Sequence, residues 1–148
     1  MELYNLFISG DDEAWKTNTT YFPLVRCIKE YTDDDLVKRF ISLGENEIEE
    51  LKKLPCIFAY EKGYEKDASI GYITDIVKRQ DQVRITFEKM DITIPKEIFE
   101  SMSFELDFRG WELTRTHWAV KKVDLFKELG ERGIIVDGVQ QNYRYRTP

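Results

Sequence analysis

Apolar and polar positions alternate with a period of two along several stretches of the chain, which is typical of half-buried β-strands. The clearest case is 83–88, where three apolar residues alternate with polar ones. Gly71, inside another apolar run, indicates a bulge or a close backbone approach of the kind that bends small sheets. The expected strands cover residues 3–8, 22–31, 56–60, 69–77, 83–88 and 104–108.

Helical spacing of apolar residues predicts four short helices between these strands. Thr32 and Asp35 have the spacing of a capping box for the first helix, which Gly44 closes, and a second helix follows over 46–54. Pro95 begins the third, and Asp124 caps the fourth. The pattern therefore predicts an α+β fold: a small bent antiparallel sheet with the character of an SH3-like barrel, flanked by short helices.

A chain of 148 residues with 42% hydrophobic residues can bury its own core. We expect a single compact domain over 1–148. It divides into a strand with two helices (1–54), a small barrel-like unit (55–130) and a hairpin or tail (131–148). The hairpin is predicted by an Asp-Gly pair at 137–138 between apolar residues.

The net charge of −6 argues against general binding to duplex DNA, which depends on neutralising phosphates with Lys and Arg. No window has the apolar length of a membrane span, and the first residues lack the pattern of a signal peptide. We therefore expect a cytoplasmic protein without membrane contact, while the composition leaves its oligomeric state open.

Residue types that bind metals or cofactors are sparse. Cys27 and Cys56 lie far apart without neighbouring histidines, so two reduced, buried thiols are favoured over a zinc or redox site. The acids at 33–35 are explained by a helix start. Because nucleophile and nucleotide-binding motifs are also missing, we expect no cofactor and no metal.

The densest candidate for a site is the stretch 111–121, which contains the only histidine of the chain. As a strand, it places Trp111, Arg115, His117 and Lys121 on one face. Arg115 then offers a bidentate fork, Lys121 a point charge, His117 a donor that titrates near neutrality, and Trp111 a stacking surface. If the stretch is a helix instead, Arg115 and His117 point in opposite directions and the four residues do not share one face.

A purely structural role for the same residues is the alternative. In it, Arg115 pairs with a nearby acid such as Glu105, Asp107 or Glu112. His117 then bonds a backbone carbonyl, and both tryptophans of the stretch are core residues.

These residues favour a non-enzymatic binding or sensing module for an anionic ligand or an acidic segment of a protein partner. One alternative is a small hydrolase or nuclease that uses His117 with Arg115 and Lys121, or His117 paired with Asp124. Another is a structural adaptor that acts through its C-terminal hairpin. Basic residues at 78–84, together with the aromatic tail, leave a local single-stranded nucleic-acid site open.

The stretch 112–125 (ELTRTHWAVKKVDL), preceded by 54–61 (LPCIFAYE), resembles a module of uncharacterised bacterial proteins of conflict or phage-defence type. The resemblance covers residues 54–129. It implies a bacterial origin and a sensing or partner-binding role, and it assigns no catalytic residues.

Overall fold

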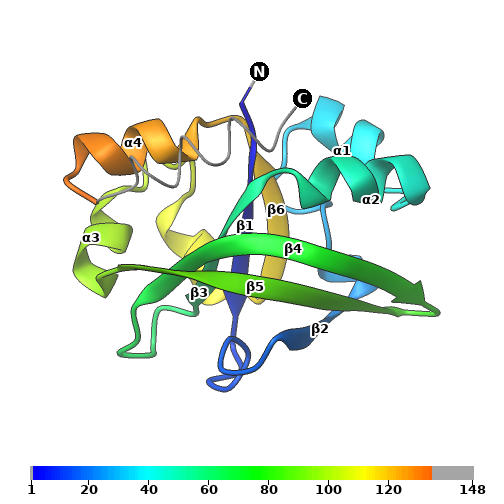
Figure 1. The fold of residues 1–148 in the computed structure, drawn as a ribbon, viewed down its shortest axis with the longest axis horizontal. Coiled ribbons are helices and arrows are strands. Elements are labelled where there is room, and N and C mark those ends of the chain that lie inside the picture. The colour runs from blue at the N-terminus through cyan, green and yellow to red at the C-terminus, as the bar shows by residue number, and fades with distance from the viewer. Residues whose placement is uncertain (1, 135–148) are drawn as a thin grey trace.

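The computed structural model describes residues 2–134. Within them the chain forms an α+β fold in which one six-stranded sheet carries short helices on both faces (Figure 1). The elements in chain order are β1 (Tyr4–Ser9), β2 (Thr19–Pro23), the 3-10 helix η1 (Leu24–Arg26), α1 (Asp34–Phe40), α2 (Glu45–Lys52), β3 (Pro55–Tyr60), β4 (Ala68–Arg79), β5 (Gln82–Ile94), α3 (Lys96–Ser101), the 3-10 helix η2 (Gly110–Thr114), β6 (His117–Lys121) and α4 (Leu125–Glu131).

The sheet is mixed, with the strand order β2-β5-β4-β3-β1-β6. The neighbouring strands β1 and β3 are parallel, and the other pairs are antiparallel, so the prediction of a wholly antiparallel sheet is wrong. A parallel pair needs a long crossover, and here β2 and two helices lie between the paired strands.

The two end strands of the sheet, β2 and β6, are not paired with each other within residues 2–134, so the sheet is not closed and the barrel character is not confirmed. The segment after β2 nevertheless reaches the opposite edge, where Cys27 forms an isolated bridge with Trp118. The amide of Ile28 donates to the Trp118 carbonyl oxygen at 2.7 Å. The segment that follows β2, at one edge of the sheet, therefore covers β6 at the other edge.

The bend of the sheet depends on Gly71 in β4. The pairing of β4 with β5 shifts register between Ser69 and Gly71, as the sequence predicts for a bulge. A Cβ atom at Gly71 would lie 2.0 Å from the carbonyl oxygen of Glu88, so only glycine allows the two backbones to approach this closely.

Alternation along the central strands separates two hydrophobic cores. In β1, Phe7 points to a core shared with α1 and α2, whereas Leu6 and Ile8 point to a core shared with α3 and α4. The first core is aromatic, with Trp15, Phe7 and Phe58 packed at ring centroid distances of 5.0–5.7 Å. Both faces of the strands β1 and β3 are thus buried, whereas β4 and β5 expose part of their side chains.

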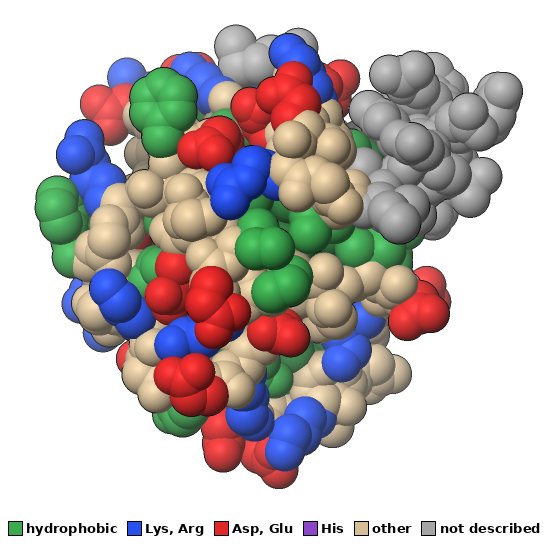
Figure 2. Space-filling model, turned by 90° about the vertical axis from the view of Figure 1, so that its left-hand side faces the viewer, with side chains coloured by type: hydrophobic (Ala, Val, Ile, Leu, Met, Phe, Trp, Pro, Cys, Tyr) green, Lys and Arg blue, Asp and Glu red, His purple; other side chains and the backbone are tan. Residues whose placement is uncertain are grey.

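The surface over α3 and α4 mixes acidic and basic side chains, with hydrophobic groups among them (Figure 2). Within residues 2–134, no helix combines the length and the apolar character needed to cross a membrane. The predicted C-terminal hairpin lies outside the described residues.

Three local predictions are wrong. Residues 104–108 form helical turns rather than a strand, since the Leu106 amide donates to the Met102 carbonyl oxygen at 2.9 Å. The segment 22–31 is extended only at its start, because η1 follows β2 directly. Gly44 begins α2 instead of closing α1, and its amide donates to the Glu47 carboxylate at 3.1 Å.

Candidate functional site

The stretch 111–121 is divided between two elements. Residues 110–114 form η2, and only His117–Lys121 is a strand, so the predicted continuous strand is confirmed in its second half. Within β6, His117 and Lys121 share a face, as predicted, while Trp118 and Val120 point to the aromatic core. The turn at η2 carries Trp111 away from that face.

His117 and Lys121 meet at a carboxylate, Glu112, that the sequence pattern did not single out. Glu112 is 1% exposed, lies 2.9 Å from His117 Nε2, and accepts a hydrogen bond from Lys121 Nζ at 3.1 Å. The backbone amide of Arg109 also donates to this carboxylate, at 3.3 Å. Three nitrogen atoms thus surround a carboxylate that is buried away from water. A buried charge needs such partners.

His117 is 0% exposed, and both of its ring nitrogens face acceptors. Nδ1 lies 2.6 Å from the Arg115 carbonyl oxygen, which can only accept, so Nδ1 carries a hydrogen. Nε2 lies 2.9 Å from a carboxylate oxygen of Glu112. The ring therefore has no free nitrogen for a substrate. The alternative in which His117 pairs with Asp124 does not hold, because both ring nitrogens contact other groups while Asp124 caps α4.

Lys121, 5% exposed, also holds the segment that covers β6: its Nζ donates to the Tyr31 carbonyl oxygen at 2.5 Å. Beside it, the Val120 amide donates to Thr32 Oγ1 at 3.1 Å. Thr32 therefore does not cap α1, which begins at Asp34 after Asp33. The candidate residues of β6 thus fasten residues 28–32 to the edge of the sheet.

Residues 28–32 need such fastening because their backbone is strained. Ile28 and Tyr31 have φ angles of 72° and 56°, in the left-handed region that residues other than glycine rarely adopt. Strain of this kind persists only where the surroundings over-determine the conformation, and it concentrates at binding and active sites. The strained segment is a wall of two adjacent clefts.

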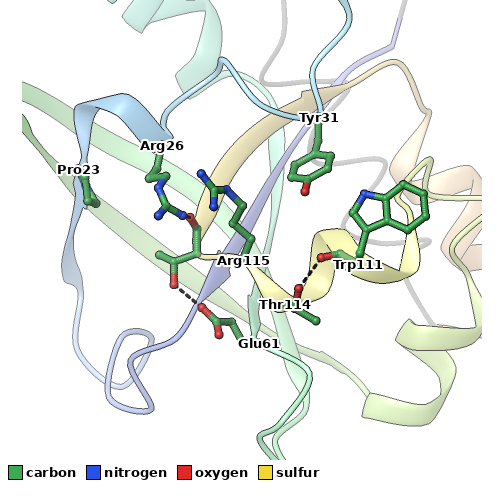
Figure 3. Close-up of a pocket in the computed structure, with 8 residues that line it drawn as sticks. Pro23, Arg26, Tyr31, Glu61, Trp111, Thr114 and Arg115 are labelled. Carbon is green, nitrogen blue, oxygen red and sulfur yellow. Dashed lines mark hydrogen bonds between the residues drawn. The ribbon is translucent and has the colours of Figure 1, made fainter.

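The larger cleft, of about 550 Å³, is lined by Pro23, Arg26, Tyr31, Glu61, Trp111, Thr114, Arg115 and Thr116. Figure 3 shows Arg26 and Arg115 toward one end and the rings of Tyr31 and Trp111 toward the other. This volume is within the range of roughly 300–1,000 Å³ typical of small-molecule sites. We refer to it as the Arg26–Trp111 cleft.

Arg115 is half-exposed and forms a bidentate ion pair with Glu30, with Nε and Nη2 at 2.5 and 2.6 Å from the two carboxylate oxygens. The hydrogen bonds from Arg115 lower the pKa of Glu30 below its ordinary value. A structural pairing of Arg115 was one alternative from the sequence, but its expected partners Glu105, Asp107 and Glu112 are wrong. Of the two guanidinium charges at this end of the cleft, that of Arg115 is therefore balanced by Glu30.

Arg26 is the cation that the sequence pattern missed. Its Nη1 donates to the Thr116 carbonyl oxygen at 3.2 Å, and within residues 2–134 it forms no ion pair. Its remaining donors face the cleft beside Arg115 (Figure 3). No local motif marks Arg26, because η1 carries it to the far edge of the sheet only after long-range pairing.

Trp111 is 61% exposed, whereas Trp15 and Trp118 are buried. The Arg109 guanidinium lies over its ring, 5.5 Å from the centroid. Thr114 Oγ1 donates to the Trp111 carbonyl oxygen at 2.7 Å and fixes the backbone of η2. The structural alternative of two core tryptophans is thus right for Trp118 and wrong for Trp111.

The smaller cleft, of about 220 Å³, lies on the other side of Tyr31, and Lys121, Arg109, Asp33 and Asp107 line it with Thr32 and Glu112. Among residues 2–134, no group of three or more His, Cys, Asp or Glu side chains is placed to hold a metal ion.

Searches of protein-family models, curated proteins and solved structures found no match to this chain. The resemblance of residues 54–129 to bacterial conflict modules therefore stays a prediction.

Proposed function

We propose that this chain is a non-enzymatic binding module that takes an anionic ligand, or the acidic segment of a protein partner, in the Arg26–Trp111 cleft. The observation that carries the proposal is Arg26: a half-buried guanidinium that forms no ion pair among the described residues, although its charge helps to lower the pKa of Glu30, at the end of a cleft of ligand size. A guanidinium with spare donors is the group that recognises carboxylates and phosphates.

The binding residues differ in part from those expected from sequence. Arg115 and Trp111 line the cleft, while His117 and Lys121 act behind it by holding the Tyr31 wall. The hydrolase or nuclease alternative is not favoured, because a catalytic base must reach its substrate and both His117 nitrogens are bonded to protein groups. A bacterial phage-defence setting is part of the proposal and is supported by the sequence resemblance alone.

Isothermal titration calorimetry tests the anion site with three probes: inorganic phosphate, citrate and a hexaglutamate peptide. We expect at least one probe to bind with an affinity that falls as salt rises, since exposed charge pairs are screened. Arg26→Gln should weaken binding about ten-fold or more, as loss of a charge-assisted hydrogen bond does.

Arg79→Gln is the matched control, because Arg79 is an exposed arginine at the β4–β5 turn, outside the cleft. It should bind as the wild type does. Absence of binding by all three probes, or equal affinities of the two variants, would contradict the proposed anion site.

A further inference from the structure

The lining of the Arg26–Trp111 cleft changes in character from one end to the other. Aromatic rings, Trp111 and Tyr31, lie at one end, and guanidinium groups lie at the other (Figure 3). A ligand that used only the cationic end would leave the aromatic end empty. An exposed tryptophan held beside a cleft is an unusual use of a large apolar side chain, which proteins normally bury or place at binding surfaces.

The Trp111 ring is prepared for stacking. Arg109 lies over it at 5.5 Å, and the backbone of η2 is fixed by the bond from Thr114 to the Trp111 carbonyl oxygen. A ring held in place loses little conformational entropy when a planar group stacks on it. Nucleobases stack on such side chains regardless of their sequence identity, because each base has a π-face.

Glu61 supplies the third feature of the cleft. Its carboxylate accepts a hydrogen bond from Thr116 Oγ1, and the same hydroxyl accepts from the Gly10 amide at 2.8 Å. A carboxylate has about four acceptor sites, so Glu61 keeps capacity for donors on a ligand. It would bind sugar hydroxyls, as acidic residues do at the ribose of dinucleotide sites.

We infer that the ligand is a nucleoside phosphate: its base stacks at the Trp111 end, its ribose hydroxyls donate to Glu61, and its phosphate is held by Arg26. This inference rests on the proposed function and narrows the anion to one class. Aromatic, hydroxyl-binding and cationic groups are the three kinds of partner that such a molecule needs.

The test is a series of titrations of the wild-type protein with the four ribonucleoside monophosphates, ribose 5-phosphate and the corresponding nucleosides. Ribose 5-phosphate lacks the base, and a nucleoside lacks the anion. We expect at least one monophosphate to bind roughly ten-fold or more tightly than either fragment, which is the effect of one stacked base or one charged contact.

Two exposed aromatic residues make a matched pair of variants. Trp111→Ala should reduce the affinity for the monophosphate to that for ribose 5-phosphate, whereas Phe104→Ala, at a residue that is 91% exposed and outside the cleft, should leave it unchanged. Acrylamide quenching gives an independent readout: since Trp15 and Trp118 are buried, the quenchable fluorescence comes from Trp111 and should be protected by the bound nucleotide.

The outcomes separate this inference from the proposed function. If ribose 5-phosphate binds as tightly as every monophosphate, or if only hexaglutamate binds, the nucleotide inference is overturned and the anion site stands. If nucleosides bind as tightly as monophosphates, the nucleotide inference is also overturned, because the phosphate then adds nothing to the affinity. If none of these molecules, phosphate, citrate or hexaglutamate binds, both the inference and the proposed function are overturned.

Discussion

Replacing Lys121 with methionine isolates the energy of the buried charge network. Methionine keeps much of the apolar stem of lysine but removes the ammonium group. Glu112, 1% exposed, would lose a donor at 3.1 Å, and the Tyr31 carbonyl oxygen would lose its donor at 2.5 Å. Among residues 2–134, His117 would remain as the one side-chain partner of Glu112.

Removing one partner of a buried ion pair costs about 3–5 kcal/mol, because the remaining charge stays buried with fewer partners. That is a large share of the roughly 5–15 kcal/mol by which domains are stable. At about 2–4 °C per kcal/mol for a chain of this size, the melting temperature should fall by roughly 6–20 °C. Urea unfolding followed by circular dichroism, with calorimetry for the melting temperature, measures both quantities.

Lys122→Met is the control, since it makes the same substitution at the next residue. Lys122 pairs with Asp33 and Asp35 on the surface, where water screens the charges, so its loss should change stability little. The double variant Glu112→Gln with Lys121→Met should recover about 1 kcal/mol or more of the single-variant loss, because the neutral amide of glutamine leaves no buried charge without a partner. Equal destabilisation by Lys121→Met and Lys122→Met would refute the reasoning from burial.

Three further predictions rest on local geometry. Because Arg115 lowers the pKa of Glu30 in the folded protein, the pair stabilises the fold above the ordinary glutamate pKa of about 4.3. This contribution is lost as pH falls through the lowered pKa. The free energy of unfolding should therefore fall less steeply with acid for Arg115→Gln than for the wild type. Gly71→Ala should destabilise by about 1–3 kcal/mol in urea unfolding, since its Cβ would meet a backbone oxygen at 2.0 Å, whereas Gly63→Ala, with no atom within 4 Å, should be close to neutral. Burial raises the pKa of Cys27 and of Cys56 to about 12, so a disulfide reagent should label both thiols quickly in urea and neither in the native protein at pH 8.

Alternation predicted the strands well where both neighbours in the sheet continue the pattern. The runs at 3–8, 56–60 and 69–77 match β1, β3 and β4 to within a few residues. The same reasoning failed at 104–108, because Leu106 and Phe108 are buried from helical turns while Phe104 is 91% exposed. Five residues are too few to distinguish a period of two from a turn whose apolar residues face one core.

The candidate site was located by residue type, but its connections could not be predicted. Arg115 and Lys121 were singled out for their charge, yet their partners, Glu30 and the Tyr31 carbonyl oxygen, lie 85 and 90 residues away in sequence. These contacts exist because residues 24–27 carry the chain from β2 to the opposite edge of the sheet, where residues 28–32 lie along β6. Local patterns contain no signal for such a crossing, which depends on the bend of the whole sheet.

Tyr31 connects the buried network to the proposed ligand site. Its backbone is held in the left-handed region by Lys121, and its side chain lines the Arg26–Trp111 cleft. If Tyr31 left this conformation, a ligand would have to restore it. The free energy of that change would then be subtracted from the binding free energy. Glu112, His117 and Lys121 thus need no contact with a ligand to matter for binding, because they keep the cleft in the shape that the ligand meets.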